Sequence, residues 1–179
     1  MDDIKLKVAE VSDAEDIMNI HFSAVHETAA SYYPGMIIQN WASPKTPERL
    51  KQFIDAIQGS DEIFVVAKIN DRTVGFGSIM PKRNELRAVY VHPSFGRQGI
   101  GTQILADLER LAVEQGIKVL DMDTSLNAER FYLKNGYVAI ESGFHKLRSG
   151  HKMPCVKMRK ILITAPCPKP RHHSVDGKV

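Results

Sequence analysis

The sequence predicts an α/β (α+β) domain with a central mixed, mostly antiparallel twisted sheet of about seven strands, flanked by about four helices. Three observations lead to this fold class. Strand-like stretches of alternating or β-branched apolar residues are interleaved with stretches of helical apolar spacing. Asn70-Asp71-Arg72 separates two of the strand-like stretches, as expected of an antiparallel hairpin. Two others, 86–91 and 117–122, bracket one long helical stretch, which implies a right-handed parallel crossover.

Length and composition indicate one globular domain. The 179 residues are 43% hydrophobic and 25% charged, which is ordinary for a soluble protein with a real core. A net charge of +3 is too small to indicate nucleic-acid binding. No apolar run approaches the ~18 residues of a membrane span, and the first residues lack the apolar stretch of a signal peptide. We therefore expect a cytoplasmic domain over residues 1–163 and a flexible tail over residues 164–179.

Cysteine and histidine usage indicates neither a disulfide framework nor a metal site. Cys155 lies in a predicted strand and Cys167 in the tail, which fits a reducing compartment. His172 and His173 are adjacent in the tail, but no cysteine or acidic residue accompanies them. We expect no bound metal.

The N-terminal third is predicted to hold one strand and two helices. Residues 4–8 alternate apolar and polar, as in a half-buried strand. Ser12-Asp-Ala-Glu15 is a capping box that opens the first helix, on whose apolar face His21 is expected to pack. Residues 29–45 are predicted to be an irregular bridge. Thr46-Pro47 then caps a second helix that ends at Gly59.

The central stretch predicts a strand, a tight turn and a helix. After the hairpin strands at 63–69 and 74–80, residues 86–91 form a strand closed by Pro93. The turn runs from Gly96 to Gly101, and the helix that follows ends at Gly116. The first turn of this helix has no carboxylate, so it offers free N–H groups at the positive end of the helix dipole. Its glycines have no Cβ, which lets a ligand approach these amides closely. Such a helix start suits a phosphate or diphosphate.

Two familiar phosphate-binding loops differ from this turn. A P-loop requires a lysine after its last glycine, and none is present. The dinucleotide fingerprint reads Gly-x-Gly-x-x-Gly, whereas here the order is reversed as Gly96-x-x-Gly99-x-Gly101. Asp121 and Asp123 do lie where a ribose-binding acid would be expected, so a dinucleotide enzyme is retained as an alternative.

A second block follows the predicted strand 117–122. It reads Asn127-Ala128-x-x-Phe131-Tyr132-x-x-x-Gly136-Tyr137, and Gly136 is a suitable left-handed end for a short helix. Residues 137–141 and 153–162 are then predicted as two last strands around a polar connection at 145–152. The predicted order of elements is βααβββαβαββ.

These features resemble the GCN5-related N-acetyltransferases (GNAT family). Val91-His92-Pro93 and Gly99-Ile100-Gly101 match the family's strand-to-helix motif, although Gly96 stands where Gln or Arg is usual. The block from Asn127 to Tyr137 matches the second motif at every fixed position. The resemblance covers roughly residues 1–162 and implies the GNAT fold. The segment 29–45 is similar to that of a bacterial subgroup with largely unassigned substrates.

The resemblance implies an acetyl-CoA-dependent N-acetyltransferase that acts directly on a primary amine of a small molecule or peptide. The turn would hold the diphosphate, main-chain groups of the central strand would hold the pantetheine arm and the developing oxyanion, and Asn127 would bond the pantetheine or cap its helix. A homodimer is common in the family. The expected coenzyme-binding residues are Val89, Tyr90, Val91, Arg97, Gln98, Gly99, Ile100, Gly101, Thr102, Asn127 and Tyr132.

Glu85 and Tyr132 are the residues that the resemblance implies for acid–base chemistry. Glu85 opens the central strand, where family members with a glutamate base carry it, and burial would raise its pKa toward neutrality. Tyr132 stands where the family keeps a tyrosine near the sulfur, and a protonated phenol can supply a proton to a thiolate. An ordinary surface glutamate and a packed tyrosine are the plainer interpretations. His26 and Glu27 are fallback bases.

The acceptor is left open by the sequence. Tyr32, Tyr33 and Trp41 lie in the segment that commonly forms one wall of the family's acceptor pocket, although aromatic residues there can simply cover the core. Lys146, Arg148 and Lys152 weakly favour an anionic or neutral acceptor over a polyamine. A catalytically silent acyl-CoA-binding regulatory module is the main alternative function.

Overall fold

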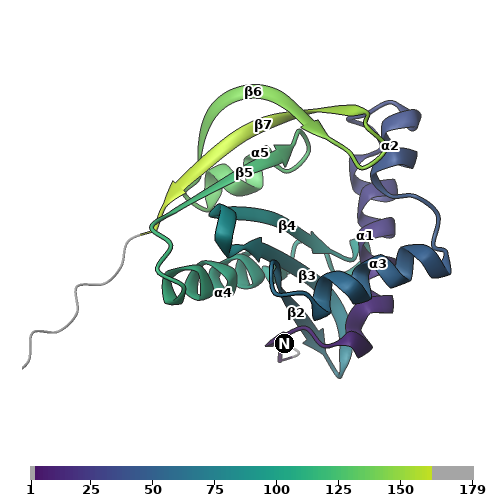
Figure 1. Ribbon diagram of the computed structural model, residues 1–179, viewed down its shortest axis with the longest axis horizontal. Helices are drawn as coiled ribbons and strands as arrows, with labels where there is room; N and C mark the ends of the chain where they lie inside the picture. Colours follow the sequence, from purple (N-terminus) through teal and green to yellow (C-terminus); the bar gives the residue numbers. More distant parts are fainter. Residues whose placement is uncertain (1–2, 163–179) are drawn as a thin grey trace, which may run out of the picture.

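The computed structural model describes residues 3–162, and these form one seven-stranded sheet in the order β1-β2-β3-β4-β5-β7-β6 (Figure 1). Every neighbouring pair is antiparallel except β4 and β5, which are parallel. The predicted fold class, hairpin and crossover are therefore confirmed. The strands are β1 (Lys5–Val8), β2 (Ile63–Ile69), β3 (Arg72–Met80), β4 (Glu85–Val91), β5 (Val119–Ser125), β6 (Val138–Lys146) and β7 (Lys152–Ile161).

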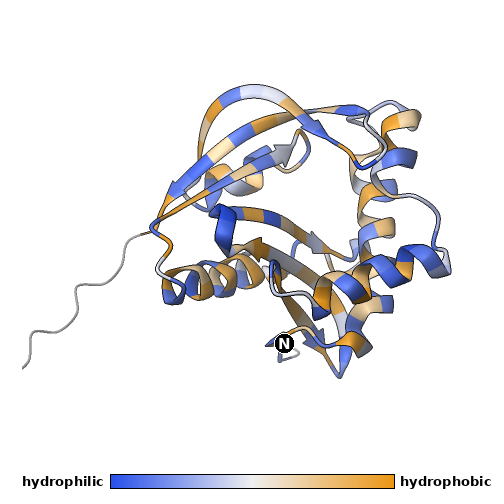
Figure 2. Cartoon of the chain, viewed as in Figure 1, coloured by the Kyte–Doolittle hydropathy of each residue, from blue (hydrophilic) through white to orange (hydrophobic). Residues whose placement is uncertain are grey.

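Five α-helices surround the sheet, and their apolar faces determine where each one packs. In α4, apolar residues at helical spacing, such as Ile104 and Leu108, pack on one face of β2–β4. In α1 and α3, residues such as Ile17 and Phe53 pack on the opposite face (Figures 1 and 2). The helices are α1 (Ala14–Ala24), α2 (Gly35–Trp41), α3 (Pro47–Gln58), α4 (Ile100–Glu114) and α5 (Glu129–Lys134).

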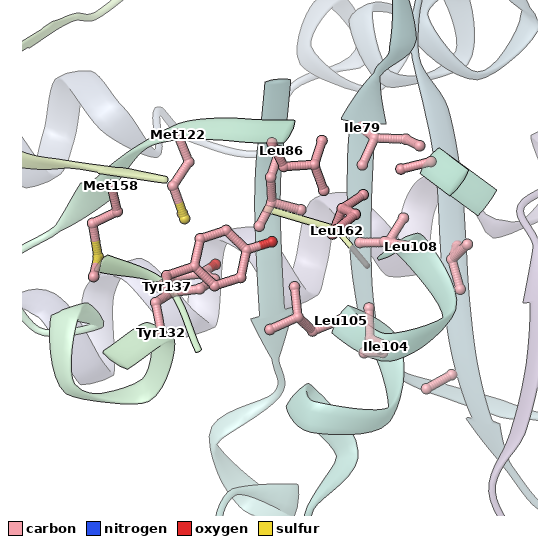
Figure 3. Close-up of a cluster of buried hydrophobic side chains, with 14 of the residues drawn as sticks. Ile79, Leu86, Ile104, Leu105, Leu108, Met122, Tyr132, Tyr137, Met158 and Leu162 are labelled. Atoms are coloured by element: carbon pink, nitrogen blue, oxygen red, sulfur yellow. The ribbon is translucent and has the colours of Figure 1, made fainter. Parts of the chain in front are cut away.

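The largest core cluster lies between α4, α5 and the sheet (Figure 3). Two glycines of β3 let α4 approach the sheet closely. A Cβ on Gly77 would lie 2.7 Å from both the Ala88 carbonyl oxygen and Leu108 Cδ1, and one on Gly75 would lie 2.9 Å from Ile104 Cδ1. The close backbone approach expected of glycines in a strand is thus made by α4.

The segment 29–45 differs from its predicted irregular form, because it contains α2. Pro34 stands just before this helix, and Ile37, Ile38 and Trp41 follow at helical spacing. Ile37 and Ile38 are buried in a separate cluster with Val25 and Ala29, from the helical turn Val25–Ala29 that follows α1, and with Met153 of β7. The helix was missed because its apolar stripe spans only seven residues.

β6 is longer than the sequence predicts, whereas β7 has the predicted length and begins one residue earlier. β6 continues to Lys146 and β7 begins at Lys152, so the connection is a tight turn at 147–151. In that turn, Leu147 N–H donates to the His151 carbonyl and Gly150 N–H donates to the Leu147 carbonyl. His145 and Lys146 consequently lie on a strand instead of in a loop.

Within residues 3–162, no helix is long and apolar enough to cross a membrane. The same part of the chain contains no group of three His, Cys, Asp or Glu residues that could hold a metal ion. The predicted tail, with Cys167, His172 and His173, lies outside the described residues.

Candidate active site

A wedge between β4 and β5 is the feature around which the candidate site is built. The two strands pair only at Glu85 and Asp121, where Asp121 N–H donates to the Asn84 carbonyl over 2.9 Å. Beyond that point they diverge, while each continues to pair with its other neighbour (Figure 1). Because the pairing is at the start of β4, the wedge opens toward the carboxyl ends of both strands. In open α/β sheets this is where ligands bind.

The main chain of β4 presents polar groups to this wedge. His92 N–H donates to the Val74 carbonyl over 2.9 Å, which fixes the alternation of hydrogen-bonded pairs between β3 and β4. The backbone groups of Ala88 and Tyr90 consequently face β3, and those of Val89 and Val91 face the wedge. The wedge therefore has an open strand edge along one side, suited to an extended ligand with amide groups.

The glycine turn lies at the mouth of the wedge and presents free amides. α4 begins at Ile100 after Gly99, its first turn contains no acidic residue, and no side chain caps it. The first bond of the helix is from Gln103 N–H to the Gly99 carbonyl, so the amides of residues 100–102 have no helical acceptor. No backbone acceptor within the described residues bonds the amides of 97–99 either.

Backbone conformation explains the glycine at position 99. Gly99 has φ of 80°, and nothing lies within 4 Å of where its Cβ would stand, so conformation and not crowding requires glycine. Arg97 also adopts a positive φ, of 64°, at the exposed tip of the turn. At Gly101 a Cβ would make ordinary contacts, 3.4 Å from the ring of Phe131 and 3.7 Å from Val91 Cγ2. The space in front of the amides is therefore open.

A small cavity of about 70 Å³ lies deeper in the wedge and is lined by Tyr132. Tyr132 is only 3% exposed, and no hydrogen bond within residues 3–162 contributes to the pKa of its hydroxyl. Burial raises its pKa, so the phenol is protonated at neutral pH. Nearby in the chain, the buried Oδ1 of Asn127 lacks a hydrogen-bond donor in the described part of the protein.

A larger cavity of about 550 Å³ lies on the α1/α3 face of the sheet, beside α2, α3 and the β6–β7 turn. Its apolar walls include Phe53, Phe64, Phe76 and Tyr90. The residues that line both cavities, and so mark where the two meet, are Trp41, Arg87, Ala88, Tyr90 and His145.

His145 and Asp123 form a pair at this junction that the sequence did not reveal. His145 Nδ1 lies 3.0 Å from Asp123 Oδ2, and Asp123 lines the smaller cavity. When Nδ1 carries the proton donated to Asp123, Nε2 has a free lone pair. The strand-like residue pattern of 138–146 was the signal that could have predicted a strand as far as His145.

Glu85, the base predicted from the sequence, lies at the start of β4 beside Arg87. Its carboxylate is half-buried, 3.4 Å from Arg87 Nη1, and it lines neither cavity. A β-bulge makes Arg87 an extra residue, since Ala88 pairs with Ser78 while Leu86 pairs with Ile79. Glu85 thus shares a face with Ala88 and Tyr90 but lies beyond the end of the larger cavity.

Of the three residues predicted to contact the acceptor, one lines the cavities and two do not. Trp41 lines both. Tyr33 is 5% exposed, and its hydroxyl donates to the Pro154 carbonyl over 2.9 Å and accepts from Leu126 N–H over 2.7 Å. It therefore ties the α1–α2 connection to β5 and β7. Tyr32 is exposed and lines neither cavity.

His21 and His26, at and just after the end of α1, pack against or bond to neighbouring residues. His21 lines the larger cavity, edge-on to Tyr90 with ring centroids 5.0 Å apart. Burial, with smaller effects of Arg49 and His26, lowers its pKa to about 3, so it is neutral and packed as expected. His26 Nε2 bonds the Ala42 carbonyl, and Glu27 is exposed; neither lines a cavity.

Comparison with known proteins identifies the family. The model of the acetyltransferase (GNAT) domain matches residues 25–162. The chain belongs to the GNAT acetyltransferase family. No curated protein sequence matches it significantly.

Solved GNAT structures have the same fold. A GCN5-related N-acetyltransferase from Rhodopseudomonas palustris is 27% identical, with a TM-score of 0.80 over 90% of this chain and 98% of that one. The PaiA N-acetyltransferase of Thermoplasma acidophilum, solved with coenzyme A, has a TM-score of 0.70 at 20% identity, covering 89% and 99% of the two chains. The putative acetyltransferase YncA of Salmonella typhimurium, solved with acetyl-CoA, has a TM-score of 0.68 at 22% identity, covering 94% and 99%.

Proposed function

We propose that this GNAT protein transfers the acetyl group of acetyl-CoA directly to the primary amine of a small molecule. The observation that carries the proposal is the wedge, which leads from the free amides of residues 97–102 to the hydroxyl of Tyr132 and there meets the larger cavity. Two of the structural neighbours were solved with coenzyme A or acetyl-CoA, which supports the same donor here.

The residues of the wedge fit the parts of coenzyme A. Diphosphate charge suits the amides at the start of α4, and Thr102 and Arg97 add a hydroxyl and a guanidinium at that mouth. The pantetheine arm has amide groups that suit the main chain of Val89 and Val91. The orphaned Oδ1 of Asn127 provides an acceptor for a further N–H group.

Bound acetyl-CoA supplies an acetyl group activated as a thioester. A backbone N–H of β4 that faces the wedge stabilises negative charge on the acetyl oxygen, and losing such a donor typically costs about 3 kcal/mol of transition-state stabilisation. A base removes a proton from the acceptor ammonium, and the freed lone pair forms the N–C bond as the C–S bond breaks. Tyr132 O–H donates its proton to the leaving sulfur. The second proton, which the acetylated nitrogen loses as the neutral amide forms, passes through water to restore the phenol.

Two side chains are candidates for the base. Glu85, predicted from the sequence, lines neither cavity and would take the proton through water. His145 lines both cavities, and Asp123 holds its ring with Nε2 unpaired. The geometry favours His145, with Asp123 as its positioning residue.

Free-thiol release from acetyl-CoA with a panel of primary amines tests the proposed function. We expect amine-dependent turnover and a raised melting temperature with coenzyme A but not with NAD. Stabilisation by coenzyme A without turnover on any amine would favour the non-catalytic acyl-CoA-binding module. Stabilisation by NAD alone would favour the dinucleotide enzyme. The predicted homodimer is tested by analytical ultracentrifugation.

A further inference from the structure

Two arginines from distant parts of the chain converge in the larger cavity. Arg49, in the first turn of α3, and Arg148, in the β6–β7 turn, both line it. Each donates from Nη1 to the same atom, Gln52 Oε1, and both distances are 2.8 Å. One neutral amide oxygen thus holds two guanidinium groups side by side.

No carboxylate neutralises this pair. Within residues 3–162, the arginines with a carboxylate inside ion-pair distance are Arg87, Arg110 and Arg159. The Arg49 guanidinium lies over the ring of Phe53, 4.7 Å from its centroid. Burial, and next the nearby charge of Arg148, lower the pKa of Arg49. Arg49 is half-buried and Arg148 is exposed, so the pair lies at the rim of the cavity. Two like charges held together there attract an anion.

The other charged side chains of the cavity wall are also mainly positively charged. Arg87 and Lys146 add two cationic side chains, and Glu62 is the only carboxylate in the lining. Glu62 is already engaged, because it accepts a 2.6 Å hydrogen bond from Ser78 Oγ. A polycationic acceptor would therefore meet repulsion here, whereas an anionic group would meet attraction.

We propose that Arg49 and Arg148 bind an oxyanion of the acceptor, and that the acceptor is a small amino acid-like molecule whose amine reaches the junction at His145. This rests on the proposed N-acetyltransferase function and names its substrate class. Guanidinium groups match the two oxygens of a carboxylate, and equally those of a phosphonate. The cavity volume of about 550 Å³ is of the size that encloses a small molecule. Its aromatic walls suit an apolar side chain.

Matched acceptors test the proposal without knowledge of the natural substrate. Alanine, leucine, methionine and phenylalanine are each compared with their carboxamide, their decarboxylated amine and their aminophosphonate analogue. We expect kcat/KM to be at least about 10-fold higher for a molecule with an oxyanion than for its matched carboxamide. The carboxylate and phosphonate members then show which oxyanion is preferred. Equal rates with and without the oxyanion would overturn the proposal.

Arginine variants assign the preference to this pair. In Arg49→Gln and Arg148→Gln we expect KM for the preferred acceptor to rise about 10- to 100-fold, with KM for acetyl-CoA unchanged. Lys51→Gln is the matched control, since it removes one positive charge from an exposed face of the same helix, where Lys51 pairs with Asp55. A preference for oxyanions that persists in both arginine variants would contradict the assignment.

Equilibrium binding separates this proposal from the proposed function. Calorimetric titration of the same amino acids and carboxamides into the protein saturated with coenzyme A needs no turnover. We expect heat of binding for the oxyanion members, and its loss in the two arginine variants but not in Lys51→Gln. Binding without catalysis would leave the arginine site intact and the acetyltransferase function in error. Catalysis on amines without any oxyanion-dependent binding would support the acetyltransferase function and contradict the arginine site.

Discussion

Glu85 of β4 pairs with Asp121 of β5, and no other pair joins these two strands within the described residues. All the other neighbouring strands pair over at least four positions. This single pairing turns the centre of a continuous sheet into an open wedge. It brings the free amides of α4, the edge of β4 and Tyr132 to one channel. The first three predictions concern that channel, and the last two concern the stability of the fold.

The first prediction concerns the charge at the start of α4. In Thr102→Glu, the new carboxylate should leave the folded protein as stable or raise its free energy of unfolding by about 0.3–1 kcal/mol, because it complements the helix dipole. The same charge should repel the diphosphate and weaken coenzyme A binding about 10-fold or more, measured by calorimetry. Gln115→Glu, at the other end of this helix, is the matched control and should bind coenzyme A normally. Equal affinity in both variants would be inconsistent with diphosphate at the turn.

The second prediction compares the two candidate bases. His145→Gln should lower kcat about 10²-fold or more, in line with the usual size of general-base catalysis, whereas Glu85→Gln should lower it less than about 10-fold. Asp123→Asn should give an intermediate loss, because it removes the group that orients His145. Steady-state kinetics at saturating acetyl-CoA measure all three. The opposite ranking, with Glu85→Gln the inactive variant, would restore Glu85 as the base.

The third prediction concerns Tyr132. Tyr132→Phe should lower kcat about 10²-fold because the leaving sulfur loses its proton donor. Stability and coenzyme A affinity should change little, since the ring stays buried in its cluster and no hydrogen bond within residues 3–162 contributes to the pKa of the hydroxyl. Because burial raises the pKa of Tyr132, its ionisation should not produce a loss of rate between pH 7 and pH 9. A large loss of folding stability in this variant would show that the tyrosine is structural.

The fourth prediction is a pH dependence of stability caused by His21. Its pKa is about 3 in the folded protein, against 6.5 for an ordinary histidine. Between those two values the unfolded chain binds a proton that the folded protein does not, so stability falls as the pH is lowered. Denaturant unfolding from pH 6.5 to pH 4 should show a slope up to about 1.4 kcal/mol per pH unit steeper than in His21→Gln. Parallel curves for the two proteins would mean that His21 gains a proton while folded.

The fifth prediction concerns the contact between α4 and β3. In Gly77→Ala, the new methyl group would lie 2.7 Å from a backbone oxygen, so we expect a loss of about 1–3 kcal/mol of unfolding free energy. Gly35→Ala is the control, because its Cβ would have nothing within 4 Å and α2 would lose a flexible residue. That variant should be more stable by about 0.5–1 kcal/mol. Thermal or denaturant unfolding checks both, and a neutral Gly77→Ala would contradict the close packing.

Local signals were sufficient to predict most of the fold. The hairpin turn, the strand closed by Pro93 and the glycine turn each lie within a few residues, and the apolar stripe of α4 lies within one continuous stretch of the sequence. The motif block around Tyr132 is likewise contiguous, and the structure places it in the wedge. Features carried by neighbouring residues can be recognised before any tertiary contact is known.

The lining of the larger cavity could not be predicted, because it depends on contacts between distant segments. Gln52 and Arg148 are 96 positions apart, and His145 and Asp123 are 22 apart on strands that do not pair with each other. The surroundings of Tyr33 could not be predicted for the same reason. Its hydroxyl finds partners in Leu126 and Pro154, which no local pattern connects to it.

A crystal structure of the complex with coenzyme A tests the central claim most directly. We predict diphosphate oxygens within hydrogen-bonding distance of the amides of residues 97–102, the pantetheine arm along Val89 and Val91, and the sulfur beside the Tyr132 hydroxyl. Coenzyme A bound outside the wedge, or a wedge closed by β4–β5 hydrogen bonds in the complex, would contradict it.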